Sequence, residues 1–201
     1  EIGVRLVGSE MCIRDRRIPS PLFHYIDGGS DDEVTLKRNI SAFDNCDLIP
    51  RVLANMTNVD LSTSLFGQKM KLPFFLSPTA MQRLFHHDGE KAIANVAKKE
   101  GIMVGVSTIG TVSMEELATI TDGPKIFQLY IHKDKGLTYD LIERAKKTNF
   151  TALALTVDTI VGGNRERDLY TGMTTPPKLT LRSLLSFAAH PECCLLYTSD
   201  A

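Results

Sequence analysis

Four short apolar runs, each ending in polar residues and followed by a stretch with helical periodicity, dominate the hydrophobic pattern of this chain. The runs cover residues 72–76, 102–106, 126–131 and 152–155. Successive runs begin roughly 25 residues apart, a spacing typical of alternating strands and helices and unlike that of a β-sandwich. Strands in such an alternation run parallel, so we expect their polar carboxyl ends to gather on one face.

Two architectures fit four such units: half of a (β/α)8 barrel, or a small doubly wound sheet. A doubly wound nucleotide-binding domain normally carries a glycine-rich turn after its first strand. Here the corresponding residues, 77–81, read SPTAM. We therefore expect an α/β fold, with the N-terminal helices and about the first four β/α units of a TIM (β/α)8 barrel.

The remaining pattern predicts helices and one hairpin. Helical segments are expected over residues 19–43, with a break at Gly28-Gly29, and over 89–99, 113–120 and 137–147. Residues 30–33 are expected to cap the second of these helices, and Ser113 begins a capping box. Residues 61–65 and 69–72 flank a turn at Gly67 and predict a hairpin. A long polar loop is expected after the fourth run.

Composition narrows the class of protein only moderately. The 201 residues are 43% hydrophobic and 23% charged with a net charge of -1, which favours a globular domain and gives no reason to expect nucleic acid as a partner. No apolar stretch approaches the ~18 residues of a membrane span. The cysteines lack metal-ligand spacing and suit a reducing compartment; they are Cys12, Cys46, Cys193 and Cys194. We expect a cytoplasmic protein and leave open peripheral attachment to the inner face of the membrane.

The two ends match neither the periodicity nor the chemistry of the middle. Residues 1–16 and 193–201 resemble translated sequencing-adapter read-through, and we expect both to be non-native. Residues 17–192 are then the usable sequence.

The polar strand ends themselves indicate a class of ligand. They supply hydroxyl, amide and phenol groups from Ser77, Thr79, Ser107, Thr108, Gln128, Tyr130 and Thr156. Such neutral groups suit a planar, heteroatom-rich cofactor, and they include no strong nucleophile or metal cluster. Gln128 on an apolar strand is costly to bury without a partner, which favours a ligand contact. His86, His87 and His132 are expected at the surface, and no metal site is expected.

Four motifs, in order and spacing, resemble the FMN-dependent α-hydroxy acid dehydrogenases and oxidases. They are FHYIDGG at 23–29, SPTAM at 77–81, FQLYIHKD at 127–134 and LTVD at 155–158. The resemblance covers nearly all of residues 17–192 and is greatest to the bacterial L-lactate dehydrogenases of the flavin type. It implies FMN as cofactor and oxidation of a small L-2-hydroxy acid, L-lactate first, to the 2-oxo acid.

The resemblance also implies roles for individual residues. Residues that would lie against the flavin or hydrogen-bond its ring are Pro78, Thr79, Ala80, Ser107, Gln128 and Thr156. Tyr25 and Arg165 would bind the substrate carboxylate, and Tyr130 would stand near its hydroxyl as the catalytic residue of this half.

Residues 17–192 contain no match for the family's catalytic histidine, its flavin-contacting lysine, its second substrate arginine or its phosphate-binding glycine loops. We therefore expect an N-terminal half of a longer enzyme, inactive alone and homo-oligomeric when complete. Ile160 and Gly162-Gly163-Asn164 depart from the family pattern and leave the substrate preference open. The electron acceptor also stays open; it is oxygen, a quinone or a cytochrome. Two alternative functions stay open as well: a non-catalytic interaction module and an FMN-dependent isomerase.

Overall fold

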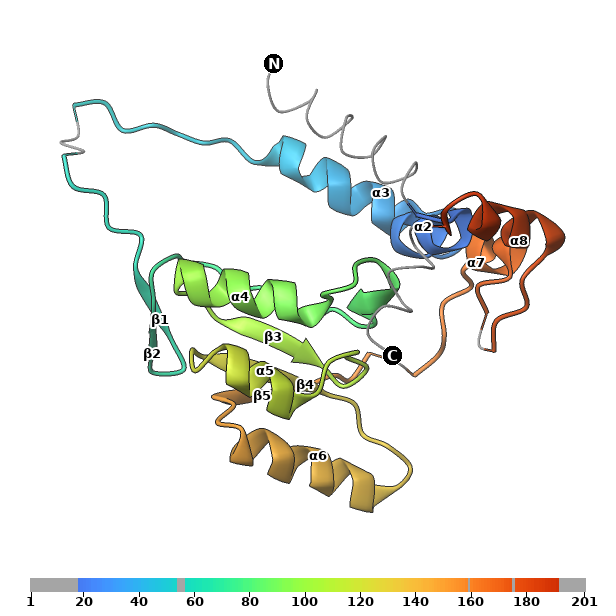
Figure 1. The fold of residues 1–201 in the computed structure, drawn as a ribbon. Helices are drawn as coiled ribbons and strands as arrows, with labels where there is room; N and C mark the ends of the chain where they lie inside the picture. The colour runs from blue at the N-terminus through green and yellow to red at the C-terminus, as the bar shows by residue number, and fades with distance from the viewer. Residues whose placement is uncertain (1–17, 54–56, 159, 175, 192–201) are drawn as a thin grey trace. The chain divides into compact units, whose positions relative to one another are not determined.

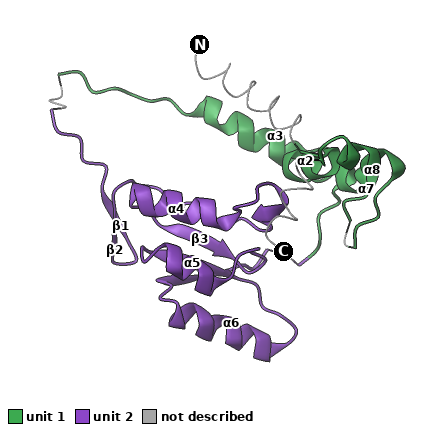
Figure 2. Ribbon diagram, viewed as in Figure 1, with its two compact units in different colours: residues 1–54, 161–201 green, residues 55–160 purple. Residues whose placement is uncertain are grey.

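A computed structural model describes residues 18–53, 57–158, 160–174 and 176–191. The chain divides into two compact units (Figure 2): unit 1 contains residues 1–54 and 161–201, and unit 2 contains residues 55–160. Each unit is described by itself. The segments expected to be non-native, 1–16 and 193–201, lie outside the described residues, so that expectation stays a prediction.

Unit 2 is built on a parallel sheet in the order β3-β4-β5 (Figure 1). The strands are β3 (Val104–Ser107), β4 (Lys125–Leu129) and β5 (Ala152–Leu155). Helices α4 (Glu90–Glu100), α5 (Met114–Ile120) and α6 (Lys135–Lys147) alternate with them along the chain. The register pairs Ser107 with Gln128, and Gln128 with Ala154, which aligns the carboxyl ends of the strands as predicted.

The helix ends of unit 2 follow from local sequence. The Ser113 side chain accepts a hydrogen bond from the Glu116 N–H and caps α5, and the Asp134 side chain caps α6 in the same way. Gly101, at φ +64°, ends α4 in the left-handed region that suits glycine. These three helices confirm the predicted segments to within a few residues.

The core of unit 2 lies between the sheet and its helices. Buried apolar side chains from both fill it: Ala94, Val106, Val112, Met114, Leu117, Phe127, Leu129 and Ala145. Burial of this set supplies the main stabilisation of the unit.

The first apolar run, residues 72–76, was predicted as a strand, and this prediction is wrong. Only Leu76 pairs, through an isolated parallel bridge to Val104. Its N–H donates to Met103 O (3.0 Å), and its carbonyl accepts from Gly105 N–H (2.7 Å). The next carbonyl of β3's N-terminal side, Gly101 O, accepts instead from the Lys71 N–H (2.9 Å), so the regular pairing stops at this bridge. The described part of unit 2 thus holds three parallel strands plus this bridge, where about four strands were expected.

The predicted hairpin is confirmed as β1 (Thr63–Leu65) and β2 (Gln68–Met70), which pair antiparallel. Its two central residues, Phe66 and Gly67, both have positive φ, at +48° and +74°. This is the pattern of a type I′ turn, whose twist matches that of the flanking strands. A short 3-10 turn, η2 (Gln82–Leu84), follows the Leu76 bridge.

Unit 1 consists of helices from two distant parts of the chain. The first part forms α2 (Ser20–Asp27), α3 (Val34–Ser41) and the 3-10 turn η1 (Ala42–Asn45), as predicted. The N-cap of α3 is Glu33, within the expected residues 30–33, but no side-chain hydrogen bond caps the helix there. The Glu33 carboxylate instead accepts from the Gly29 N–H (3.0 Å), which closes the Gly-Gly break.

The second part was predicted as a polar loop, and this prediction is also wrong. It contains α7 (Glu166–Thr171) and α8 (Leu181–Ala188). Gly172, at φ +74°, ends α7, and the Thr180 side chain accepts from the Ser183 N–H at the start of α8. These are ordinary stop and start signals. No helix in the described part of the chain is long and apolar enough to cross a membrane.

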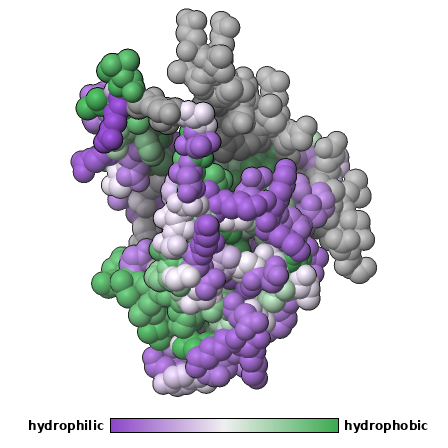
Figure 3. Space-filling view, turned by 90° about the vertical axis from the view of Figure 1, so that its left-hand side faces the viewer, coloured by the Kyte–Doolittle hydropathy of each residue, from purple (hydrophilic) through white to green (hydrophobic). Residues whose placement is uncertain are grey.

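Unit 2 leaves large hydrophobic side chains exposed on and after β5, namely Leu153, Leu155 and Val157. A hydrophobic patch is also visible on the face drawn in Figure 3. β5 is the last strand of the described sheet. Among the described residues, no strand pairs with its outer edge, which could accept a further strand.

Candidate functional site

A closed hydrogen-bond network joins the carboxyl ends of the three strands of unit 2. Gln128, which is only 8% exposed, stands at its centre. Its Oε1 accepts from Ser107 Oγ (3.0 Å) and from Thr108 N–H (3.2 Å), and its Nε2 donates to Thr156 Oγ1 (2.6 Å). The structure therefore brings together Ser107, Gln128 and Thr156, three of the predicted cofactor-binding residues.

Thr108 extends this network to the backbone. Its Oγ1 donates to Gln128 O (2.5 Å) and accepts from Tyr130 N–H (3.1 Å). The hydroxyl therefore fixes the backbone on both sides of Leu129, at the point where β4 ends. Tyr130, the predicted catalytic residue of this half, follows directly and is partly exposed.

The segment that carries Pro78, Thr79 and Ala80 lies against β3 because residue 105 is glycine. A Cβ on Gly105 would stand 2.6 Å from both Pro78 Cδ and Pro78 N, closer than side-chain carbons approach other atoms. The Met81 N–H also donates to Ile109 O (2.9 Å), tying this segment to the loop after β3. Gly105 could not be predicted as a site residue, since a glycine within an apolar run carries no sign of what approaches it.

Glu90 is a second residue that could not be predicted as part of the site. It is 3% exposed, and its carboxylate accepts from Thr111 N–H (2.8 Å) and Thr111 Oγ1 (2.6 Å). These bonds hold the loop after β3 against the first turn of α4. An acid at a helix start is common for reasons of the helix dipole alone, so the sequence signal was weak.

A hollow of about 460 Å³ adjoins the strand-end network and is lined by Ile109, Tyr130, Ile131 and Thr156. This volume falls within the roughly 300–1,000 Å³ of small-molecule sites. Two residues of the predicted site, Tyr130 and Thr156, therefore face a space that a planar ligand could fill. Asp158 is exposed beyond it.

The two predicted carboxylate-binding residues, Tyr25 and Arg165, lie together in unit 1. The Arg165 guanidinium carbon stands 5.1 Å from the centre of the Tyr25 ring, and its Nη2 donates to the Tyr25 carbonyl. Its Nε donates to Asp168 Oδ2 (2.5 Å). Asp168 is buried, and its Oδ1 has no hydrogen-bond partner. The guanidinium is thus oriented by two neighbours and stacked on the tyrosine.

Arg167, unlike Arg165, forms ion pairs with two carboxylates of unit 1. Its Nη1 donates to Asp27 Oδ2 (2.9 Å) and its Nη2 to Glu33 Oε2 (2.7 Å), joining α7 to the residues around the Gly28-Gly29 break. A larger hollow, about 640 Å³, also lies in unit 1, but neither Tyr25 nor Arg165 lines it.

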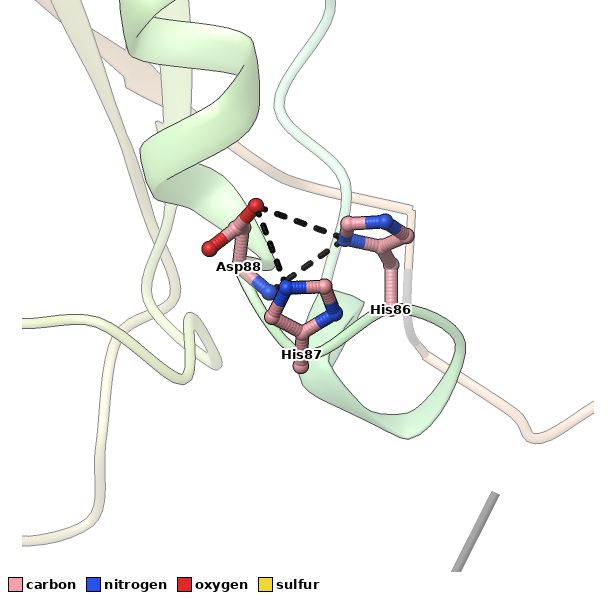
Figure 4. A group of neighbouring side chains, drawn as sticks. All are labelled: His86, His87 and Asp88. Atoms are coloured by element: carbon pink, nitrogen blue, oxygen red, sulfur yellow. Dashed lines mark hydrogen bonds and ion pairs between the residues drawn. The ribbon is translucent and has the colours of Figure 1, made fainter. Parts of the chain in front are cut away.

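His86, His87 and Asp88 form a compact exposed group before α4 (Figure 4). Their possible ligand atoms lie within 4.8 Å of one another. His86 Nδ1 already accepts from the Asp88 N–H (3.3 Å), and the two imidazole rings stack at 4.4 Å. The surface position predicted for these histidines is confirmed. The prediction that they bind no metal stays a prediction.

Comparison with known proteins settles the family. The family model described as FMN-dependent dehydrogenase matches residues 14–200. The chain belongs to this family. FMN is therefore the cofactor, as the motifs implied.

Curated relatives agree with this assignment. An L-lactate dehydrogenase of Ectopseudomonas mendocina is 42% identical over 178 residues, which are 89% of this chain and 47% of the relative. A glycolate oxidase of Spinacia oleracea is 38% identical over 172 residues, 86% of this chain and 47% of the relative. The chain spans about half the length of the curated relatives it matches.

Solved structures show the same fold. A monotopic membrane protein, (S)-mandelate dehydrogenase, matches with a TM-score of 0.87 and 31% identity over 95% of this chain and 51% of its own. A putative lactate oxidase of Pediococcus acidilactici matches with a TM-score of 0.79 and 37% identity over 90% of this chain and 50% of its own. With the parallel strand-helix order of unit 2, these matches confirm the expected fold class, part of an α/β barrel.

The strand-end network fits the flavin of this family. The polar edge of a flavin ring presents carbonyl and N–H groups, and the network offers neutral hydroxyl and amide partners to both. The hydrogen bond between Ser107 and Gln128 fixes both side chains, so they would already be oriented when the ring binds. The residues that would hold FMN on this chain are Ser107, Gln128 and Thr156, with the 78–80 segment beside them. These individual contacts remain predictions.

Proposed function

We propose that the complete protein, of which this chain supplies one half, oxidises a small L-2-hydroxy acid to its 2-oxo acid, with L-lactate as the first candidate. The match of residues 14–200 to the FMN-dependent dehydrogenase family carries this proposal. The names of its relatives point to lactate, glycolate and mandelate, which are all 2-hydroxy carboxylates.

FMN, when bound, accepts the two electrons of the oxidation. The chain's own residues have simpler tasks. Ser107, Gln128 and Thr156 orient the ring through neutral hydrogen bonds. Arg165, stacked on Tyr25, binds the substrate carboxylate by charge-assisted pairing. Tyr130 donates to or accepts from the substrate hydroxyl. The proton acceptor lies outside this chain.

The decisive experiment is a titration of the complete protein, purified and freed of oxygen, with L-lactate. We expect a yellow protein whose flavin absorbance bleaches on addition of L-lactate and not of D-lactate. Glycolate and (S)-mandelate are tested in parallel, and the rate of flavin bleaching with each compound ranks the substrates. A colourless protein that FMN cannot reconstitute would overturn the proposal.

Arg165 gives a more specific test in the complete protein. Arg165→Lys keeps the charge but loses the planar, two-point pairing with a carboxylate. We expect the KM for L-lactate to rise about tenfold or more, which is ~1.4 kcal/mol of lost binding, with a smaller change in kcat. Arg38→Lys, on the exposed face of α3, is the matched control and should leave KM unchanged. An unchanged KM for Arg165→Lys would remove this residue from the substrate site.

We also propose that the complete protein associates peripherally with a membrane. The support is its likeness to the (S)-mandelate dehydrogenase described as monotopic. Separation of a cell lysate into membrane and supernatant fractions tests this. Recovery of all the protein in the supernatant at low salt would contradict it.

A further inference from the structure

The turn that follows β3 is held in place by one buried carboxylate. Glu90, at the start of α4, is only 3% exposed, and its two oxygens accept from the N–H (2.8 Å) and the Oγ1 (2.6 Å) of Thr111. Both residues belong to unit 2. Since the described residues of this unit already enclose Glu90, its contacts do not depend on any part of the protein outside this chain.

The Thr111 hydroxyl also joins this turn to the segment that carries Pro78, Thr79 and Ala80. Its Oγ1 accepts from the Arg83 N–H (3.2 Å), in the 3-10 turn η2 that follows this segment. The turn and the segment are held together at a second point, where the Met81 N–H donates to the backbone carbonyl of residue 109 (2.9 Å). The Thr111 side chain therefore connects α4, η2 and the turn after β3.

The inner end of the same turn sets the direction of a hydroxyl in the strand-end network. The Ile109 N–H donates to Ser107 Oγ (3.2 Å), and this hydroxyl donates to Gln128 Oε1 (3.0 Å). The Gly110 N–H donates to the Ser107 carbonyl (3.0 Å) and closes the turn. A serine hydroxyl has one hydrogen, so accepting from Ile109 leaves that hydrogen for Gln128.

We propose that Glu90 is a positioning residue for the flavin site. By fixing Thr111 it fixes the turn of residues 107–111, and the turn in its place directs the Ser107 hydroxyl towards Gln128. Glu90 itself touches neither flavin nor substrate in this assignment. The assignment rests on the proposed role of the strand-end network in holding FMN, and it adds a residue that acts on this network from a distance.

The test is a titration of the complete protein, freed of its flavin, with FMN, followed by the change in flavin fluorescence. Glu90→Ala leaves the Thr111 N–H without its acceptor, and we expect the Kd for FMN to rise about fivefold or more. Glu90→Gln keeps an oxygen for this N–H and an amide for the hydroxyl, so it should recover most of the lost affinity.

Thr111→Val is a second, milder variant that tests the same contact if Glu90→Ala does not fold. It keeps the shape of the side chain and removes the hydroxyl, and we expect a rise in the Kd for FMN of about threefold or more. Combining Thr111→Val with Glu90→Ala should raise the Kd little beyond the larger single effect, because both changes break the same contact.

Ser113→Ala is the matched control for lost stability. It removes the N-cap of α5 on the same connection between β3 and β4, where Ser113 Oγ accepts from the Glu116 N–H (3.1 Å). We expect this control to lower the thermal midpoint of the flavin-free protein and to leave the Kd for FMN unchanged. Thermal midpoints of all variants, measured without FMN, allow variants of similar stability to be compared.

The outcomes separate this proposal from the ones on which it rests. Unchanged FMN affinity in both Glu90→Ala and Thr111→Val overturns it, and so does an equal loss of affinity in Ser113→Ala. If Gln128→Leu weakens FMN binding and the Glu90 variants do not, the network stands and only the positioning role is wrong. If Gln128→Leu binds FMN normally, the network itself has no such role. The titrations contain no hydroxy acid, so their results do not depend on which substrate the protein oxidises.

Discussion

Gln128 is the residue on which the strand-end network depends, because it alone bonds to residues from both neighbouring strands. Its position could be predicted from the sequence, since an amide within an apolar run must find partners when it is buried. Its partners could be predicted only as candidates. The parallel register, which sets Ser107 beside it, decides that Ser107 and Thr156 occupy opposite ends of one amide.

Gln128→Leu tests this network in the complete protein. The change leaves Ser107 Oγ and Thr108 N–H without their acceptor, so we expect the free energy of unfolding to fall by about 1–3 kcal/mol. We also expect a lower content of bound FMN, measured from the ratio of flavin to protein absorbance. Gln68→Leu, on an exposed position of β2, should change neither quantity. Normal flavin content in Gln128→Leu would remove this residue from the cofactor site.

At the scale of elements, the approach of the 78–80 segment to β3 depends on a single glycine. Gly105→Ala would place a Cβ 2.6 Å from Pro78, so the segment must move. We expect a loss of about 1–3 kcal/mol in stability and weaker FMN binding, measured by thermal unfolding and by flavin titration. Gly162→Ala, where a Cβ meets nothing within 4 Å, is the control and should leave both unchanged.

Helices α5 and α6 are joined by an ion pair whose strength depends on pH. Arg144 donates to both carboxylate oxygens of Glu115 (2.8 Å each) and lowers the pKa of Glu115 from 4.5 to about 2. Since the folded pKa lies below the unfolded one, the stabilisation is fully present above pH 4.5 and is lost as pH falls towards 2.

Solvent reaches both partners, so we expect a stabilisation of only about 0.5 kcal/mol. Glu115→Gln should lower the thermal midpoint slightly at pH 7 and leave it unaffected near pH 2. Glu100→Gln, at an exposed acid on α4, serves as the comparison. An equal loss for Glu115→Gln at both pH values would contradict the pH-dependent pairing.

At the scale of the whole molecule, the unpaired edge of β5 is expected to govern how the chain associates. Leu153 and Leu155 are about half exposed on this strand, and an unpaired edge with apolar side chains recruits other chains. We expect the 201-residue chain alone to sediment as large species, whereas the complete protein forms defined oligomers. Leu155→Lys should reduce the association of the short chain, because a charge on an edge strand opposes pairing. A monodisperse, cooperatively unfolding short chain would favour the interaction-module reading instead.

The sequence by itself determined the order of strands and helices from α4 to β5, the cap at Ser113, the turn at Gly67 and the family. These features follow from periodicity and from motifs that are local in the chain. Only the tertiary structure decided that residues 72–76 pair at a single bridge, that Gly105 admits Pro78 and that Glu90 holds Thr111. Each of these depends on what a distant segment places beside the residue, and a residue's own neighbours in sequence carry no trace of that contact.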